Sequence, residues 1–339
     1  MPICSRRCVL AFGLIFLAAR LPAEELFTRV HPAMGTDFTL YIYAADAAAA
    51  DREVDRAFAI VDQLESLLSN YQPQSELSRI NANASSHPVT TDPETFRFLK
   101  ESLVWSERSD GAFDITVGKL VKAWGFFRST GHPSGRVPTD AELARVRAET
   151  GWKRVVLNAA TRTVRFTTPG VELDPGGIGK GFAVDAAIEA LRADGVHAAL
   201  LSAGSSTIYG LGAPPSSQGW KVHVPDPQHP DAKSKGGRIS TVVLRDTSLS
   251  TANCSEKHFI VGSHLYCHIM DPRTLRPVEG RLQATVIAPS ATDSDALSNA
   301  MFVLGATGRR RLMQTLPAAD RALVVLAGGS TEKYRWTGH

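Results

Sequence analysis

The sequence is poor in cysteine, its charges nearly cancel, and the apolar run near its N-terminus is short. This run, Cys8–Ala19, has 12 residues, whereas a helix that crosses a bilayer needs about 20. Two arginines precede the run and a Pro-Ala pair follows it, which is the arrangement of an export signal. We therefore expect Met1–Ala23 to be a cleaved export signal peptide, with a retained membrane anchor as the alternative.

The chain also lacks an excess of charge of either sign. Removal of residues 1–23 takes away three arginines and no acidic residue, so 37 basic residues become 34 and equal the 34 acidic ones. A neutral chain carries no electrostatic signature of binding to nucleic acid or to an anionic membrane. Neither class of partner is therefore indicated. The 43% content of hydrophobic residues suits a globular protein with a large core.

Only four cysteines occur, and the predicted signal peptide removes two of them, leaving Cys254 and Cys267. An oxidising compartment would allow these two to pair, since they flank a predicted β-hairpin. Two buried free thiols are the alternative, because spacing alone does not fix the geometry that a disulfide needs. The sequence leaves both possibilities open.

The glycine-rich stretch Val171–Asp185 matches neither of the common nucleotide-binding loops. No Ser or Thr follows Gly179-Lys180, as a P-loop requires, and the glycines do not follow the pattern G-x-G-x-x-G. Four glycines in six residues still let a ligand approach the main chain, and the predicted helix after them offers unpaired N–H groups to a phosphate. Asp174 could accept a hydrogen bond from a ligand, and Lys180 could neutralise a phosphate. The alternative is a strand-to-helix turn whose glycines serve packing.

No standard zinc pattern is present. Three histidines, at positions 258, 264 and 268, have spacings that match no known zinc motif. Asp295 and Asn299, in contrast, stand at i and i+4 of a predicted helix, so both oxygens project from one face. Mg²⁺ prefers such oxygen ligands. The alternative is that Asp295 only favours the helix N-terminus through the helix dipole.

Alternating and helical periodicities predict a mixed chain in which helices and antiparallel strands are interspersed. A glycine at Met34-Gly35-Thr36 interrupts the first strand, and we expect either a bulge or a point of ligand approach there. Helices are predicted over 51–68, 75–81, from 92 to 110, from 139, over 180–193 and over 294–304. Strands are predicted over 27–43, 112–116, 154–157, 161–166, 198–202, 208–211, 220–224, 239–244 and 283–288, with polar loops over 131–138 and 225–235.

Taken together, these stretches resemble the ApbE family, the FAD:protein FMN transferases of bacteria. The resemblance covers most of the chain after the predicted signal and indicates one domain over 24–339. It rests on Met34-Gly35-Thr36, Tyr71 with Ser75–Asn81, Gly111–Thr116, Asp174–Asp185, His268–Pro272 and Asp295–Gly305, which occur in the family's order.

The resemblance implies an α+β, T-fold-like protein with antiparallel sheets and two intertwined lobes that hold FAD between them. It implies an enzyme that cuts the FAD pyrophosphate, attaches FMN to a Thr or Ser hydroxyl of an acceptor protein and releases AMP. Mg²⁺ would be required. The acceptor would be a subunit of a membrane redox complex or a small FMN-carrying domain, facing the periplasm.

The resemblance also assigns site residues. The FAD site would be formed by Met34, Tyr71, Ala112, Phe113, Asp114, Asp174, Lys180 and Ile269. Mg²⁺ would bind the Gly177 carbonyl, the Asp295 carboxylate and the side-chain oxygen of Asn299.

The acceptor hydroxyl must lose its proton as it attacks phosphorus, and an imidazole titrates close to neutral pH. His268 is the predicted base, and Asp271 would orient it. Four positions depart from the family's usual residues: Ser206, Asn253, Leu275 and Asn299. Two further functions therefore stay open, a Mg²⁺-dependent FAD pyrophosphatase that uses water and a non-catalytic FAD carrier.

Overall fold

The computed structural model describes residues 24–127, 135–229, 237–255 and 257–338. The predicted signal peptide lies outside these residues, as do residues 131–134 and 230–235 of the two predicted loops. Among the described residues, no helix combines the length and the apolarity that crossing a bilayer requires.

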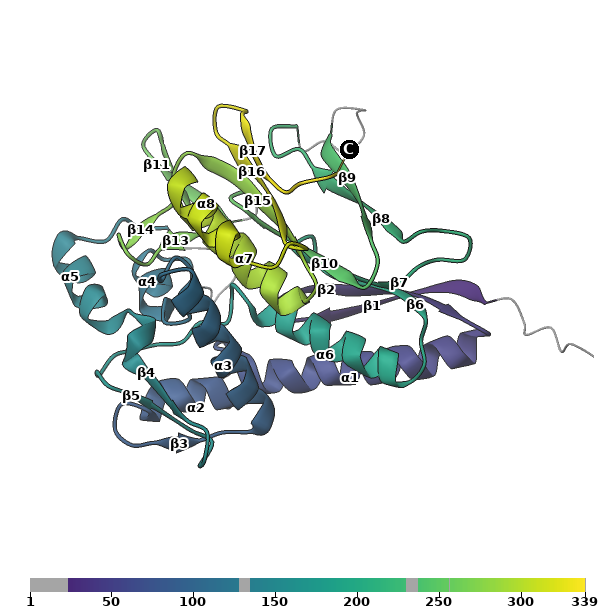
Figure 1. The fold of residues 1–339 in the computed structure, drawn as a ribbon. Helices are drawn as coiled ribbons and strands as arrows, with labels where there is room; N and C mark the ends of the chain where they lie inside the picture. The colour runs from purple at the N-terminus through teal and green to yellow at the C-terminus, as the bar shows by residue number, and fades with distance from the viewer. Residues whose placement is uncertain (1–23, 128–134, 230–236, 256, 339) are drawn as a thin grey trace, which may run out of the picture.

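An eight-stranded antiparallel sheet forms the centre of the molecule (Figure 1), in the order β1-β2-β6-β7-β10-β15-β16-β17. Its strands are β1 (Glu25–Ala33), β2 (Thr36–Ala44), β6 (Ala198–Ala203), β7 (Thr207–Gly212), β10 (Thr247–Asn253), β15 (Arg281–Ala288), β16 (Arg321–Leu326) and β17 (Thr331–Tyr334). Strands far apart in the chain are neighbours here, since β2 pairs with β6 and β10 pairs with β15.

Helices cover one face of the sheet and a two-stranded ribbon covers the other. The helices on this face are α1 (Ala47–Leu68), α6 (Gly179–Ala193) and α7 (Ala291–Val303), with α8 (Ala306–Thr315) next to α7. The ribbon consists of β8 (Trp220–Pro225) and β9 (Arg238–Leu244). Leu249, Ile287 and Leu323 of the sheet pack against this ribbon, while Ala284 and Val286 of the same sheet belong to the core beneath the helices. The alternation of strand side chains therefore builds three layers.

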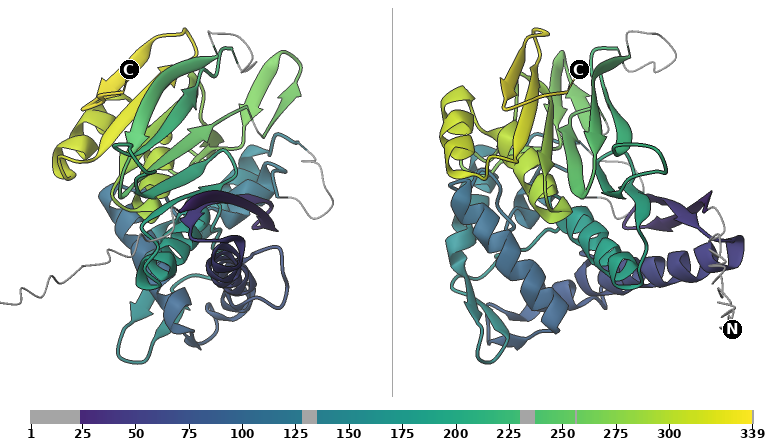
Figure 2. Two further views of the ribbon diagram at one scale, coloured as in Figure 1. Left: turned by 90° about the vertical axis from the view of Figure 1, so that its right-hand side faces the viewer. Right: turned by 45° about the vertical axis from the view of Figure 1, so that its right-hand side comes forward.

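A second lobe is inserted between α1 and α6 (Figure 2). It contains α2 (Glu76–Asn83), β3 (Val89–Thr90), α3 (Pro93–Arg108), α4 (Gly118–Ala123), α5 (Asp140–Glu149), the 3₁₀ turn Trp152–Arg154, β4 (Val155–Asn158) and β5 (Thr163–Phe166). The remaining strands form two hairpins near this lobe: β11 (His258–Val261) with β12 (His264–Cys267), and β13 (Met270–Asp271) with β14 (Arg276–Pro277). The α+β, two-lobed architecture that the sequence predicts is therefore confirmed.

Side-chain caps explain where several helices begin. The hydroxyl of Ser75 accepts from Ser78 N at 3.0 Å, and a capping box joins Thr139 to Glu142 at the start of α5. Ser290 caps α7 by accepting from Asp293 N. These caps confirm the predicted helices near 75, 139 and 294, although α7 begins earlier than predicted.

The stretch 27–43 is not one interrupted strand. It forms the β1–β2 hairpin, in which Ala33 pairs with Thr36 across a two-residue turn. Met34 has φ 50° and Gly35 has φ 73°, and positive φ at both positions is what a tight hairpin turn requires. The prediction of a bulge within one strand is therefore wrong, while the alternative of a ligand-approach point at this glycine stays a prediction.

The predicted strand at 112–116 is also absent, because a side chain closes a turn there. Asp114 Oδ1 accepts from Thr116 N at 2.8 Å and from Thr116 Oγ1 at 2.6 Å. This local bonding competes with an extended strand. Phe113 and Ile115 are buried as expected, but they are buried by a loop that leads into α4.

Candidate functional site

A cavity lies where the second lobe meets the glycine turn and α7. Its walls come from the α1–α2 loop, the α3–α4 segment, the turn before α6, the segments that flank the β11–β12 hairpin, and α7. It is lined by Tyr71, Ala112, Phe113, Asp114, Val117, Val121, Phe126, Asp174, Gly176, Gly177, Lys180, Lys257, His268, Ile269, Met270, Pro272, Asn299 and Val303.

Ten of the thirteen residues predicted for the site line this one cavity. Segments more than 200 residues apart in the chain are therefore brought together, as the resemblance implies. Three predicted residues, Met34, Asp271 and Asp295, are not among the lining residues. Met34 lies in the β1–β2 turn and packs against the main core, so its contact with FAD stays a prediction.

The glycine turn presents main-chain groups to the cavity. Asp174 Oδ1 accepts from Gly176 N at 2.8 Å, which fixes the turn before α6 begins at Gly179. Burial raises the pKa of Asp174, and hydrogen bonds from Gly176 and Asn70 and the charge of Lys257 oppose that rise. The turn and the helix are where the sequence predicts them, while the strand before them is reduced to one bridge between Val117 and Glu172.

Asp114 is a buried carboxylate that the chain itself satisfies. Asp114 Oδ1 accepts hydrogen bonds from Thr116, and Asp114 Oδ2 accepts one from Trp152 N at 2.9 Å. Burial raises the pKa of Asp114, and these hydrogen bonds oppose the rise. Its first effect is therefore to hold the loop that carries Ala112 and Phe113 against the cavity.

Tyr71 lies at an edge of the cavity and is 53% exposed. Its ring stacks on Phe127 with the ring centres 4.6 Å apart and the planes 9° from parallel. Lys122 in turn lies 4.4 Å from the centre of the Phe127 ring. An exposed, stacked aromatic beside a cavity can take a flat ligand on its surface.

The three predicted metal ligands lie around the first turn of α6. Asn299 Nδ2 donates to the Gly177 carbonyl at 3.2 Å, and Gly181 N donates to Asp295 Oδ2 at 3.0 Å. Asp295 is 4% exposed. Burial raises its pKa, and the nearby charge of Lys180 is the strongest influence that lowers it.

This donor set fits a hard cation. The nitrogen and oxygen of an amide are exchanged by a 180° flip, which would turn Asn299 Oδ1 toward the Gly177 carbonyl. One carboxylate, one amide oxygen and one carbonyl leave room for the waters and phosphates that Mg²⁺ usually keeps. Within the described residues, no group of three or more His, Cys, Asp or Glu side chains is placed to bind a metal. Any metal site here therefore depends on main-chain and amide oxygens.

His268 is held by the main chain. Its N donates to the Lys257 carbonyl at 3.1 Å, and its ring Nδ1 lies 2.9 Å from the same oxygen. A carbonyl can only accept, so Nδ1 carries the proton and Nε2 of the neutral ring is a proton acceptor.

Asp271 does not orient this imidazole through Nδ1, contrary to the prediction. The carboxylate of Asp271 accepts from Arg273 N, Nε and Nη2 at 2.8 to 3.0 Å. It therefore closes the turn before β14, and the orienting group is the Lys257 carbonyl.

Two kinds of residue escaped prediction. Lys257 lines the cavity and lowers the pKa of Asp174 by its charge, but nothing in its sequence surroundings marks it. The apolar wall from Val117, Val121 and Phe126 belongs to the α4 region. That helix has 6 residues, too few for helical periodicity to show.

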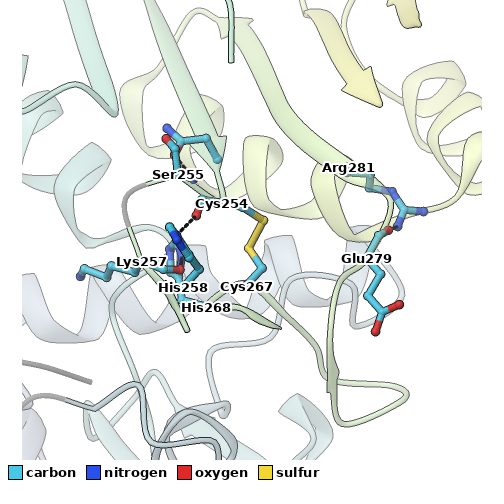
Figure 3. The surroundings of a disulfide bond; sticks show 9 residues. Cys254, Ser255, Lys257, His258, Cys267, His268, Glu279 and Arg281 are labelled. Atoms are coloured by element: carbon cyan, nitrogen blue, oxygen red, sulfur yellow. Dashed lines mark hydrogen bonds between the residues drawn. A yellow bond between two sulfur atoms is a disulfide. The ribbon is translucent and has the colours of Figure 1, made fainter. Parts of the chain in front are cut away.

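Cys254 and Cys267 form a disulfide, with Cα atoms 5.2 Å apart. The pairing joins the end of β10 to the end of β12 (Figure 3). It decides between the two alternatives that spacing leaves open.

Comparison with known proteins agrees with this geometry. The ApbE family profile matches residues 34–323. An FAD:protein FMN transferase of Treponema pallidum is 30% identical over 314 residues, which are 88% of this chain and 84% of that protein. One of Vibrio cholerae is 30% identical over 308 residues, covering 87% and 86% of the two chains.

Solved structures show the same fold. The ApbE protein of Thermotoga maritima superposes with a TM-score of 0.81 at 28% identity, covering 91% of this chain and 97% of that one. The flavinyl transferase ApbE of Pseudomonas stutzeri, in its apo form, gives a TM-score of 0.79 at 26% identity and covers 92% and 96%. All residues that line the cavity therefore fall within the part of the chain that matches the ApbE family profile.

Proposed function

Because this chain belongs to the ApbE family, we propose that it is an FAD:protein FMN transferase, which moves FMN from FAD to a Ser or Thr hydroxyl of an acceptor protein. The bond between the two phosphates of FAD breaks, a phosphoester to the acceptor forms, and AMP leaves. The observation that supports this most is one cavity that contains a glycine turn, Lys180 and a main-chain-oriented histidine.

FAD would lie across the cavity. The stacked Tyr71 suits a flat ring system, and Asp174 can accept from ring N–H or sugar hydroxyl groups. The ammonium of Lys180 suits the pyrophosphate, whereas the N–H groups of Gly179 and Gly181 at the start of α6 already donate to the Pro175 carbonyl and to Asp295. Ala112, Phe113 and Ile269 supply apolar contact.

The Gly177 carbonyl, Asp295 and Asn299 would hold Mg²⁺. When bound, such an ion neutralises charge on phosphate oxygens and on the leaving group. Within the chain, Gly181 N and Lys180 favour the charged form of Asp295, against the burial that raises its pKa.

His268 would take the proton of the acceptor hydroxyl on Nε2. Its Nδ1–H is held by the Lys257 carbonyl, so the ring is fixed in the tautomer that can act as a base. The accepting nitrogen then moves the proton away as the oxygen attacks phosphorus.

Export to the periplasm through residues 1–23 forms part of this proposal, since Arg6, Arg7 and the following apolar run have the pattern of a signal peptide. Acceptors would then be subunits of membrane redox complexes or FMN-carrying domains that face the same compartment. Fractionation of cells that express the full chain would test this, and recovery in the cytoplasm at full length would contradict it.

The function is tested with purified protein, FAD, Mg²⁺ and a candidate acceptor domain. We expect equal amounts of AMP and of acceptor that has gained one FMN, measured by chromatography and intact-protein mass spectrometry. AMP and free FMN without labelled acceptor would identify a pyrophosphatase instead. Tight FAD binding with no AMP under any metal would identify a carrier.

A further inference from the structure

The disulfide lies next to the proposed base in both the sequence and the structure. Cys267 directly precedes His268, and Cys254 follows the last residue of β10. Figure 3 shows the two sulfur atoms beside Lys257, His258 and His268. Cys254 is 9% exposed and Cys267 is 1% exposed, and both belong to the main core. The bond therefore anchors this segment to the interior.

Among its described residues, the segment between the two cysteines contacts the rest of the molecule through aromatic packing and through the pair of His264 with Glu279. It contains the β11–β12 hairpin, which forms a separate two-stranded sheet outside the eight-stranded one. Ile260, Val261 and Leu265 in it are 62%, 48% and 46% exposed, while Phe259 and Tyr266 pack on the small cluster around Trp124. An isolated two-stranded hairpin is marginally stable by itself. Its base therefore depends strongly on the covalent link.

The same segment carries the group that orients the base. The Lys257 carbonyl lies inside the closed loop, and His268 lies just outside its end. The disulfide thus fixes both partners of the Nδ1 hydrogen bond relative to the core. Ile269, Met270 and Pro272 follow shortly after Cys267 and also line the cavity, whereas Phe113, Asp174 and Lys180 belong to elements that the disulfide does not join.

We propose that the Cys254–Cys267 disulfide is a positioning element for His268, so that reduction slows transfer to the acceptor without weakening FAD binding. The inference rests on the proposed transferase function. Reduction breaks one S–S bond, adds two electrons and two protons, and leaves two thiols, while a dithiol reagent is oxidised to its own disulfide. Because a displacement of about 1 Å in a catalytic group can cost about 100-fold, we expect the transfer rate to fall about 10- to 100-fold.

The test compares the oxidised mature chain with the same chain after dithiothreitol treatment and with Cys254→Ser/Cys267→Ser. The single-turnover rate of FMN transfer, the KM for the acceptor and the Kd for FAD are measured in each. We expect both reduced forms to lose rate at unchanged FAD affinity, and dithiothreitol to have no effect on the double variant. Circular dichroism checks that each form is folded.

A second arm separates positioning from a general structural role. In the His268→Ala background, adding Cys254→Ser/Cys267→Ser should slow transfer by less than twofold, because the group that the disulfide positions is already gone. An equal loss in both backgrounds, an unchanged rate on reduction, or a parallel loss of FAD affinity would each overturn the inference. Absence of transfer in the oxidised wild-type chain would instead reject the proposed function.

Discussion

At the scale of single residues, the site depends on carboxylates that the protein has made hard to ionise. Burial raises the pKa of Asp114, Asp174 and Asp295. Each accepts at least one hydrogen bond from a main-chain N–H, from Thr116, Gly176 and Gly181 respectively. Such bonds favour the charged form. Asp114 and Asp174 therefore line the cavity and also hold its turns in place through main-chain hydrogen bonds. Asp295 lies behind the cavity and holds the start of α6 in the same way.

Replacement of His268 by Ala tests the proposed base. We expect the transfer rate to fall by about 10² to 10⁴, the usual contribution of a general base, and the Kd for FAD to change little. His264→Ala is the matched control, because His264 belongs to the hairpin that His268 directly follows, pairs with Glu279 at 2.9 Å and does not line the cavity. Equal rates for the two variants in a single-turnover assay would assign the proton transfer to another group.

Replacement of Asp295 by Asn tests the proposed metal site. The amide keeps the size of the carboxyl and an acceptor for Gly181 N, but removes the charge that would attract a cation. Changes in outer-shell groups alone weaken metal binding by about 10- to 100-fold, so the loss of a ligand should cost at least that. Titration of AMP release with MgCl₂ measures it. A Mg²⁺ requirement equal to that of the wild type would place the ion elsewhere.

At the scale of elements, the sequence predicts best where a local cap or a periodic face defines the structure. The helices that begin after Ser75, Asp92 and Thr139 each carry a capping side chain that can be recognised in advance. The glycine turn before α6 and the i, i+4 pair on α7 are predictable for the same reason. Each of these signals needs only neighbours in the chain.

Elements whose signals come from distant residues were missed. Strand β10 (Thr247–Asn253) is polar in sequence but buried, because Ser248 and Ser250 both hydrogen-bond Ser294 of α7 at 2.8 and 2.7 Å. No local pattern reveals such a partner. The orientation of His268 by the Lys257 carbonyl is equally non-local, since the two are 11 residues apart across a hairpin.

Leu275 is one of the four residues at which the sequence differs from the pattern that the resemblance implies. It has φ 62°, in the left-handed region where glycine is favoured. Its side chain is 2% exposed in the cluster with Trp124, and its carbonyl accepts from Trp124 Nε1 at 3.0 Å. Burial of the leucine side chain therefore offsets the backbone strain at this turn.

The contact between α6 and α7 gives a prediction at the same scale. A Cβ at Gly181 would lie 2.2 Å from the Ala291 carbonyl oxygen and 2.8 Å from Asp295 Cβ. Gly181→Ala should therefore separate the two helices and destabilise the fold by about 1–3 kcal/mol, which urea unfolding measures. The MgCl₂ concentration at which AMP release is half-maximal should also rise, because Gly181 and Asp295 move apart.

Gly328→Ala is the control for this substitution, since a Cβ there meets nothing within 4 Å. Equal stability of the two variants would show that the helices adjust at no cost. A loss of stability with an unchanged Mg²⁺ midpoint would separate the helix contact from the metal site.

At the scale of the whole molecule, one continuous core joins the two lobes. The same cluster contains Phe98 and Phe166 of the inserted lobe, Leu40 of the sheet and Phe302 of α7. Trp105 Nε1 of α3 also donates to Asp293 Oδ1 of α7 at 2.7 Å. Because the cavity takes walls from both lobes, this shared core fixes its shape. A change that destabilises the whole fold should therefore also disturb the arrangement of the cavity walls.

One buried acid makes that stability depend on pH. Asp320 is 4% exposed, and its Oδ1 has no hydrogen-bond partner among the described residues. Burial, with a smaller contribution from Asp293, raises its pKa from 3.8 to about 6. The folded carboxyl thus keeps its proton where the unfolded one has lost it. The stability that this group contributes is full below about pH 4 and falls until about pH 6, after which it stays low.

Asp320→Asn removes this titration. The variant should gain on the order of 1 kcal/mol over the wild type at pH 7.5 and much less at pH 4.5, because only the ionised carboxyl is disfavoured by burial. Urea unfolding at the two pH values measures the difference, with the exposed Asp55→Asn as control. A gain of equal size at both pH values would show that packing, not ionisation, separates the variant from the wild type. A gain confined to pH 7.5 would show that ionisation of the buried Asp320 carboxyl lowers the stability of the folded protein above about pH 6.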